Sequence, residues 1–215
     1  MRTSSVIVVL IALTLVALFL PASSHAQAWS EFFSLEDRFQ IGFPSEPSVE
    51  HISYIGVNGN PFPAHRYFVN ERAQSYAVIV VDFTTAYDFA TASDSEEMVV
   101  LGAIAHAATN YRQRGEVTYD GYTRYDRLPA HKLQITEPDG RLLYVSILLH
   151  EDHKMDARRL YIIEASAPPG APPPLAFQGT FYITDENLER ISYDTDAEGH
   201  RIRIIPGSGG IPIPE

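Results

Sequence analysis

Cysteine is absent from this chain of 215 residues. The absence excludes a Cys nucleophile, a thiolate zinc site, an iron–sulfur cluster and thiol redox chemistry, because each of them needs cysteine sulfur. Disulfide bonds are excluded too, so the folded state must be stabilised by its hydrophobic core. A lipoprotein anchor is also excluded, since no Cys is present to carry the lipid.

Basic residues are few. The chain has 16 Lys and Arg against 27 Asp and Glu, which gives a net charge of −11. Arg158-Arg159 is the densest basic spot in the sequence. An acidic surface repels nucleic acid phosphates and anionic lipid headgroups, so we expect no nucleic acid partner.

No apolar run reaches the roughly 20 residues that a membrane-spanning helix needs. The longest, Val6 to Leu20, follows the single charge at Arg2 and precedes Ala26-Gln27-Ala28. A positive start, a short apolar core and a small-x-small site are the three parts of a secretory signal. We expect cleavage after Ala28, a periplasmic or secreted mature protein, and no membrane anchor after cleavage; the alternative is an uncleaved anchor.

Alternating polar and apolar residues predict several strands in the first half of the chain. Residues 38–43 alternate in this way. Val49 to Val57 and Ala64 to Val69 flank Asn58-Gly59-Asn60-Pro61, and Asn-Gly favours a hairpin because both residues tolerate positive φ. Gln74 to Phe83 is mostly apolar, which is typical of a strand buried on both faces.

One long helix is predicted over residues 94–113. Ser93 and Glu96 have the spacing of a capping box, and Gly115 favours a helix end. Apolar residues recur at helical spacing between these two signals, which predicts that one face packs on a sheet. This stripe consists of Leu101, Ile104, Ala105, Ala108 and Tyr111.

The second half predicts strands at 116–127, 128–136, 142–150 and 158–165, with a turn at Asp139-Gly140. Consecutive strands joined by short turns favour antiparallel pairing. A Pro-rich linker at 167–174 precedes a short helix that starts near Pro174, and 191–205 suggests a closing hairpin.

The predicted fold class is α+β: a twisted antiparallel β-sheet with one long central helix and a short C-terminal helix packed on it. We expect a signal peptide at 1–28, a single α+β domain at 29–205, and a disordered Gly/Pro-rich tail at 206–215.

The segment Asp37–Pro47, with the sequence DRFQIGFPSEP, is similar to the opening of a group of uncharacterised exported bacterial proteins. Together with the hairpins, the helix and the late Pro-rich segment, it also resembles the superfamily that contains the PsbP extrinsic protein of photosystem II. The resemblance implies an antiparallel sheet flanked by helices and an accessory or binding role. It implies no catalytic residue and no cofactor, since no site motif matches.

The candidate metal ligands are His150 and His153, in His150-Glu151-Asp152-His153. Imidazoles and carboxylates are good zinc or copper ligands. The two His are three residues apart, whereas the helical zinc-protease pattern places them four apart. Side chains three apart in a strand point to opposite faces, so only a tight bend would bring them together. The alternative is a solvated polar turn.

Three tyrosines, Tyr119, Tyr122 and Tyr125, would not share one face of a regular strand, so either a bulge intervenes or some are exposed. Exposed tyrosines would offer contact area to a partner.

We therefore expect a non-enzymatic binding or accessory protein whose partner is another envelope protein or a small ligand. Two alternatives stay open: a periplasmic metal-binding protein using His150 and His153, and an envelope hydrolase whose triad no Gly-x-Ser-x-Gly motif reveals.

Overall fold

The computed structural model describes residues 29–71, 73–84, 96–152, 157–197 and 201–204. Its main element is a seven-stranded sheet in which every neighbouring pair is antiparallel. In spatial order the strands are β3 (Ser48–Ile55), β4 (Pro61–Glu71), β5 (Gln74–Asp82), β9 (Ala157–Ala167), β8 (Leu142–Asp152), β7 (Leu128–Thr136) and β6 (Glu116–Tyr125).

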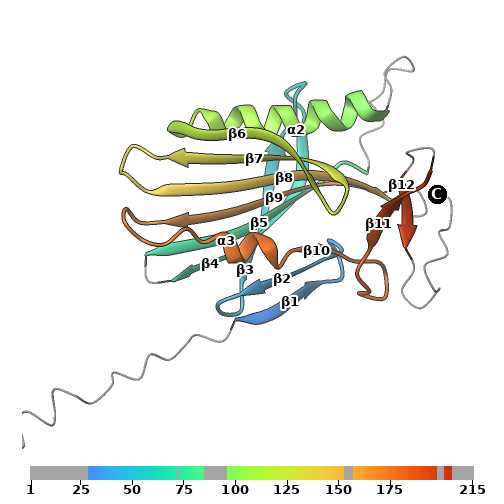
Figure 1. Ribbon diagram of the computed structural model, residues 1–215, viewed down its shortest axis with the longest axis horizontal. Helices are drawn as coiled ribbons and strands as arrows, with labels where there is room; N and C mark the ends of the chain where they lie inside the picture. The colour runs from blue at the N-terminus through green and yellow to red at the C-terminus, as the bar shows by residue number, and fades with distance from the viewer. Residues whose placement is uncertain (1–28, 72, 85–95, 153–156, 198–200, 205–215) are drawn as a thin grey trace, which may run out of the picture.

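One face of this sheet is covered by a second sheet and a short helix (Figure 1). The second sheet has the order β1 (Ser30–Ser34), β2 (Phe39–Phe43) and β10 (Tyr182–Ile183), and the helix is α3 (Leu175–Gly179). Period-two alternation sends Phe39, Ile41 and Phe43 of β2 into the core between the two sheets, where all three are fully buried. Aromatic rings dominate this core, and Phe39 and Phe181 are stacked there.

The opposite face carries helix α2 (Glu96–Arg112), which packs on β7 and β8 (Figure 1). Ala103, Ile104, Ala107, Ala108 and Tyr111 are buried against the sheet. The predicted stripe is therefore confirmed for Ile104, Ala108 and Tyr111, whereas Leu101 and Ala105 are only half-buried. A separate two-stranded unit consists of β11 (Ser192–Thr195) and β12 (Arg201–Ile204). It contributes the buried Tyr193 to the core between the seven-stranded sheet and the β1–β2–β10 sheet.

The two predicted glycine hairpins are confirmed, and the closing hairpin predicted at 191–205 is the antiparallel pair β11–β12. β3 pairs with β4 around a turn in which Gly59 has φ of 77°, a conformation that favours glycine. β7 pairs with β8 around Gly140, where φ is 83°. The strand predicted at 74–83 is β5, and it lies inside the sheet with Val78 and Val80 in one core and Val81 in the other.

The predicted fold class is wrong. Strands hold most of the described residues, and α2 lies over the β7–β8 part of the sheet rather than at the centre of the fold. The short helix α3 packs on β9 and β2, on the face opposite α2, and not on the long helix. The physical reason is that a period-two pattern identifies a strand but not the sheet that it joins. The alternation at 38–43 predicts the strand β2 without showing that it joins a separate sheet, and no sequence pattern predicts β1.

The predicted signal peptide at 1–28 and the tail at 206–215 lie outside the described residues. Neither helix of the described part is long and apolar enough to cross a membrane.

Candidate functional site

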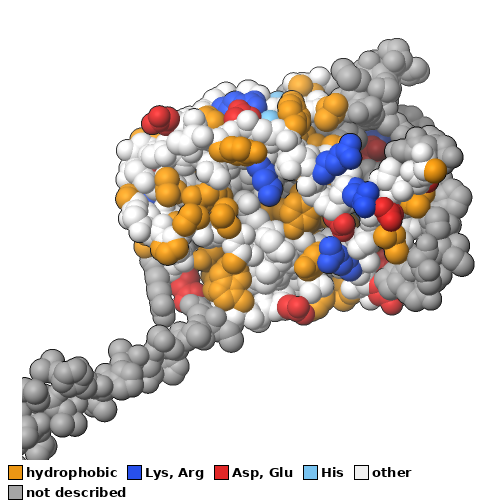
Figure 2. Space-filling view, viewed as in Figure 1, with side chains coloured by type: hydrophobic (Ala, Val, Ile, Leu, Met, Phe, Trp, Pro, Cys, Tyr) orange, Lys and Arg blue, Asp and Glu red, His pale blue; other side chains and the backbone are white. Residues whose placement is uncertain are grey.

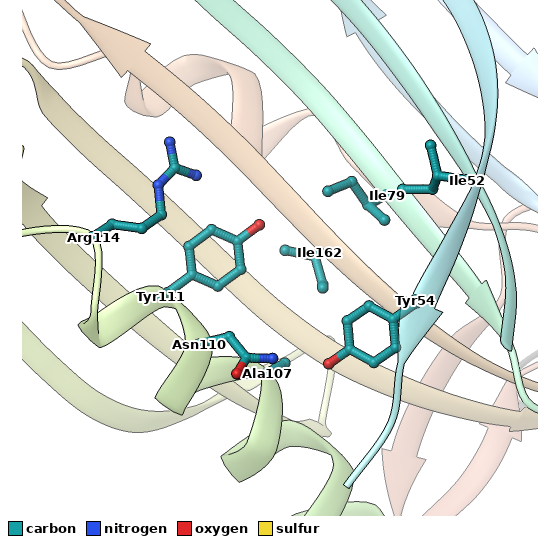
Figure 3. Close-up of a pocket in the computed structure, with 8 residues that line it drawn as sticks. All are labelled: Ile52, Tyr54, Ile79, Ala107, Asn110, Tyr111, Arg114 and Ile162. Atoms are coloured by element: carbon teal, nitrogen blue, oxygen red, sulfur yellow. The ribbon is translucent and has the colours of Figure 1, made fainter. Parts of the chain in front are cut away.

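An open pocket of about 230 Å³ lies between the C-terminal half of α2 and the sheet (Figure 3). The sheet side is formed by β3, β5 and β9, and the helix side by the last two turns of α2 and by Arg114, two residues beyond the helix end. The lining residues are Ile52, Tyr54, Ile79, Ala107, Asn110, Tyr111, Arg114 and Ile162.

Strand periodicity explains the apolar floor. Ile52 and Tyr54 are two residues apart on β3 and share a face, and Ile79 and Ile162 are directly paired across β5 and β9. Because α2 packs on β7 and β8, the neighbouring part of the same face is left concave. Ala107 on the helix contributes little side-chain volume opposite the isoleucines.

Charged groups at one end of the pocket are paired with one another. The Tyr111 hydroxyl donates a hydrogen bond to Glu164 on β9, and Arg114 donates from Nη1 to the same carboxylate at 3.4 Å. The other Arg114 nitrogens, Nε and Nη2, donate to Glu137 at 3.1 and 2.7 Å. Burial, followed by the adjacent Glu164, raises the pKa of Tyr111 well above its ordinary value, so this phenol stays protonated.

The Tyr54 hydroxyl is the one polar group of the pocket that is buried without a hydrogen bond among the described residues. It points toward the Asn110 amide on α2 (Figure 3), which acts on the phenol oxygen as a hydrogen-bond donor without making a well-formed hydrogen bond, so the O–H proton has no acceptor among the described residues. Burial raises the pKa of Tyr54 to about 12, and Asn110 opposes part of this rise. A buried polar group without a hydrogen bond costs about 1–3 kcal/mol. The Tyr54 hydroxyl therefore favours binding of a ligand in the pocket that accepts a hydrogen bond from it.

A second polar cluster is centred on the buried Asp37. Its Oδ2 accepts hydrogen bonds of 2.7 Å from both His65 Nδ1 and the Tyr67 hydroxyl. The Tyr161 hydroxyl donates to the Asp37 carbonyl at 2.9 Å. The carboxylate orients the His65 ring through Nδ1, and the other ring nitrogen, Nε2, lies 3.9 Å from Glu36 Oε1.

A third cluster joins α2 to the edge strand β6. Arg112 donates to both oxygens of Asp120, at 2.6 and 3.0 Å, and His131 Nε2 lies 2.5 Å from Asp120 Oδ1. These contacts, first Arg112 and then His131, lower the pKa of Asp120 to about 2. The other His131 nitrogen, Nδ1, is buried without a partner among the described residues.

Neither His–Asp pair is a nucleophilic triad in the described part of the chain. No Ser or Thr hydroxyl there hydrogen-bonds to His65 or to His131. A triad needs its nucleophile within hydrogen-bond reach of the imidazole. The hydrolase alternative gains no support from these two pairs and stays a prediction.

Of the two predicted metal ligands, one is described. His150 lies on β8, is buried, and has Nε2 2.7 Å from the Tyr193 hydroxyl. His153 lies outside the described residues. Within those residues, no group of three or more His, Asp and Glu side chains has a geometry that could hold a metal ion. The metal site at His150 and His153 is therefore not tested and stays a prediction.

The three predicted tyrosines fall in different environments. A register shift between Val117 and Tyr119 confirms the bulge, and Tyr119 and Tyr122 are exposed by 47% and 64%. Tyr125 instead donates to the carbonyls of Gln178 and Phe181 and ties β6 to the segment around α3. On the face shown in Figure 2, the Lys and Arg side chains are scattered rather than gathered into one patch.

Sequence reasoning missed the pocket. Two signals for it were present: Ile52 and Tyr54 share a strand face, and Ala107, Tyr111 and Arg114 recur at helical spacing of four and three. Neither signal says that the helix end and strand β3 meet, because that contact depends on the order of strands in the sheet.

No family model and no curated protein sequence matches this chain. Among solved structures, it is similar to the solution structure of cyanobacterial PsbP (CyanoP) from Synechocystis sp. PCC 6803. The match covers 75% of this chain and 95% of that chain, with 11% sequence identity and a TM-score of 0.45. The predicted resemblance to the PsbP superfamily is thus confirmed as a likeness of fold, and it carries no argument about function.

Proposed function

We propose that this protein is an exported, non-enzymatic binding protein whose ligand is a small molecule held in the pocket between α2 and strands β3, β5 and β9. The observation that carries the proposal is the buried Tyr54 hydroxyl beside an open apolar floor, because its proton has no hydrogen-bond acceptor in the described part of the chain. Ligand sites in proteins are typically concave and mostly apolar, with a few polar groups that orient the ligand.

The lining favours binding over catalysis. The eight described lining residues include no Ser, Thr, His or carboxylate, and the single cation, Arg114, is engaged by two glutamates. Acid–base catalysis needs a titratable group within reach of the substrate, with its pKa near the working pH. The two tyrosines at the pocket have raised pKa values and stay neutral.

Native mass spectrometry of the protein purified gently from producing cells tests the proposal. We expect a small-molecule adduct on the wild-type protein. Ala107→Leu, which fills the pocket from the helix, should remove the adduct, whereas Ala105→Leu, on the same helix but outside the lining, should keep it. An adduct that survives Ala107→Leu, or a wild-type protein that carries only a protein partner, would contradict the proposal. Thermal unfolding of both variants shows that each is folded.

A further inference from the structure

We infer that the pocket takes a neutral, mostly apolar ligand of one-ring size that carries a hydrogen-bond acceptor, and that this acceptor is placed at the corner formed by Tyr54 and Asn110. The inference rests on the proposed binding function and specifies the ligand class.

The size of the ligand follows from the volume of the pocket. About 230 Å³ is less than the roughly 300 Å³ at which sites for drug-sized ligands begin, and more than the roughly 150 Å³ of a cavity that holds benzene. A single ring with a short substituent matches this space. Contacts from Ile52, Ile79 and Ile162 would cover the apolar body of such a ligand.

The neutrality of the ligand follows from the charges around the pocket. Arg114 already faces two carboxylates, Glu137 and Glu164, so this end of the pocket has an excess negative charge. The next cation on this face of the sheet, Arg66, is paired with Glu50 at 3.4 Å. An anionic ligand would add a third negative group, and the described residues offer no free cation near the pocket to meet it. An ammonium group would lose its hydration beside the isoleucines.

The hydrogen-bond acceptor follows from Tyr54. Its hydroxyl is buried and has no hydrogen-bond acceptor within the described residues, and it is protonated at physiological pH because its pKa is raised to about 12. Asn110, which lies beside this hydroxyl (Figure 3), is exposed, and its Nδ2 makes one long contact of 3.5 Å with His106 Nε2. Turning the Asn110 side chain would break only this weak contact and open the Tyr54 hydroxyl to the pocket. A ligand carbonyl or ether oxygen would satisfy the hydroxyl and also accept from the Asn110 amide.

The test is an NMR titration of the full protein, purified from cells that process it, with Ile methyl groups labelled. Acetophenone, toluene and benzoate share one ring and differ in acceptor and charge. Acetophenone should shift the methyl signals of Ile52, Ile79 and Ile162 and leave Ile163, on the opposite face of β9, unchanged. It should bind about 3- to 10-fold more tightly than toluene, the range that one net hydrogen bond supplies, and at least about 10-fold more tightly than benzoate.

Tyr54→Phe distinguishes the role of the hydroxyl from that of the ring. The variant should bind toluene as the wild type does and should bind acetophenone no more tightly than toluene. Two results would overturn the ligand class without overturning the proposed binding function. One is benzoate binding as tightly as acetophenone or more tightly. The other is acetophenone binding that Tyr54→Phe leaves unchanged. Silence of the three pocket methyls toward all three probes would overturn both the ligand class and the proposed function.

Discussion

Tyr111, near the end of helix α2, donates a hydrogen bond to Glu164 in the middle of strand β9, 53 residues further along the chain. The contact fixes the helix end against the sheet at the point where the pocket begins. Arg114 donates to the same carboxylate from the solvent side, so a mostly buried acid on β9 is shared by two groups from one helix end.

Tyr111→Phe should destabilise the protein. The substitution keeps the ring and removes the hydroxyl, which leaves the mostly buried Glu164 with Arg114 as its remaining partner. We expect a loss of about 1–2 kcal/mol in the free energy of unfolding, measured by urea denaturation. Tyr119→Phe, at a side chain that is 47% exposed, is the matched control and should change the stability by less than about 0.5 kcal/mol. Equal effects at the two positions would contradict this account.

Tyr54→Phe should have the opposite effect in protein free of ligand. Its hydroxyl is buried without an acceptor among the residues that the structure describes, so its removal takes away an unmet desolvation cost. We expect unchanged stability or a gain of up to about 1 kcal/mol by the same measurement. A loss above about 1 kcal/mol would mean that the hydroxyl has a stabilising partner in solution.

Asp120→Asn should lower stability in a pH-dependent way. The pKa of Asp120 is about 2 in the folded protein, below its ordinary value of 3.8, because of Arg112 and His131. A carboxyl whose pKa is lower in the folded than in the unfolded protein stabilises the folded state at pH values above its unfolded pKa. This stabilisation is lost as the pH falls through the folded pKa. After a discount for the exposure of this ion pair, we expect a deficit of about 1 kcal/mol at pH 6 that shrinks between pH 4 and pH 2. A deficit that is constant down to pH 2 would contradict the ionic origin.

Two glycines at α2 should respond oppositely to alanine. A Cβ at Gly115 would lie 2.2 Å from the backbone oxygen of Thr136, so Gly115→Ala must displace β7 and should cost at least about 2 kcal/mol. Gly102 lies inside the helix, exposed and with open space around its Cβ position, so Gly102→Ala should add about 0.5–1 kcal/mol. Thermal unfolding of the two variants compares them directly, and effects of equal sign would count against the packing described for the helix end.

Local patterns predicted most of the individual elements. The strands at 74–83, 128–136 and 142–150, both glycine hairpins and the long helix were each specified by neighbours in the sequence. Such features depend on side-chain periodicity and on positive φ, which act over a few residues.

What the sequence could not supply was the relation between elements. No local sequence pattern predicts that β2 pairs with β1 and β10 in a sheet of its own. None predicts that α3 covers the face of the main sheet opposite α2. Asp37 illustrates the difficulty, because its partners His65, Tyr67 and Tyr161 lie up to 124 residues away. The pocket was missed for the same reason: Tyr54 and Asn110 meet only through the packing of the helix end on the sheet.

The location of a bound ligand tests the central claim most directly. Intermolecular NOEs between ligand protons and Ile methyl groups would be measured on the ligand-loaded protein, with the ligand identified by native mass spectrometry or with acetophenone as the probe. The account predicts NOEs to Ile52, Ile79 and Ile162, which line the pocket beside α2. NOEs to Ile183 and Ile191, which line a separate small cavity near Tyr193, with none to the first three, would contradict it.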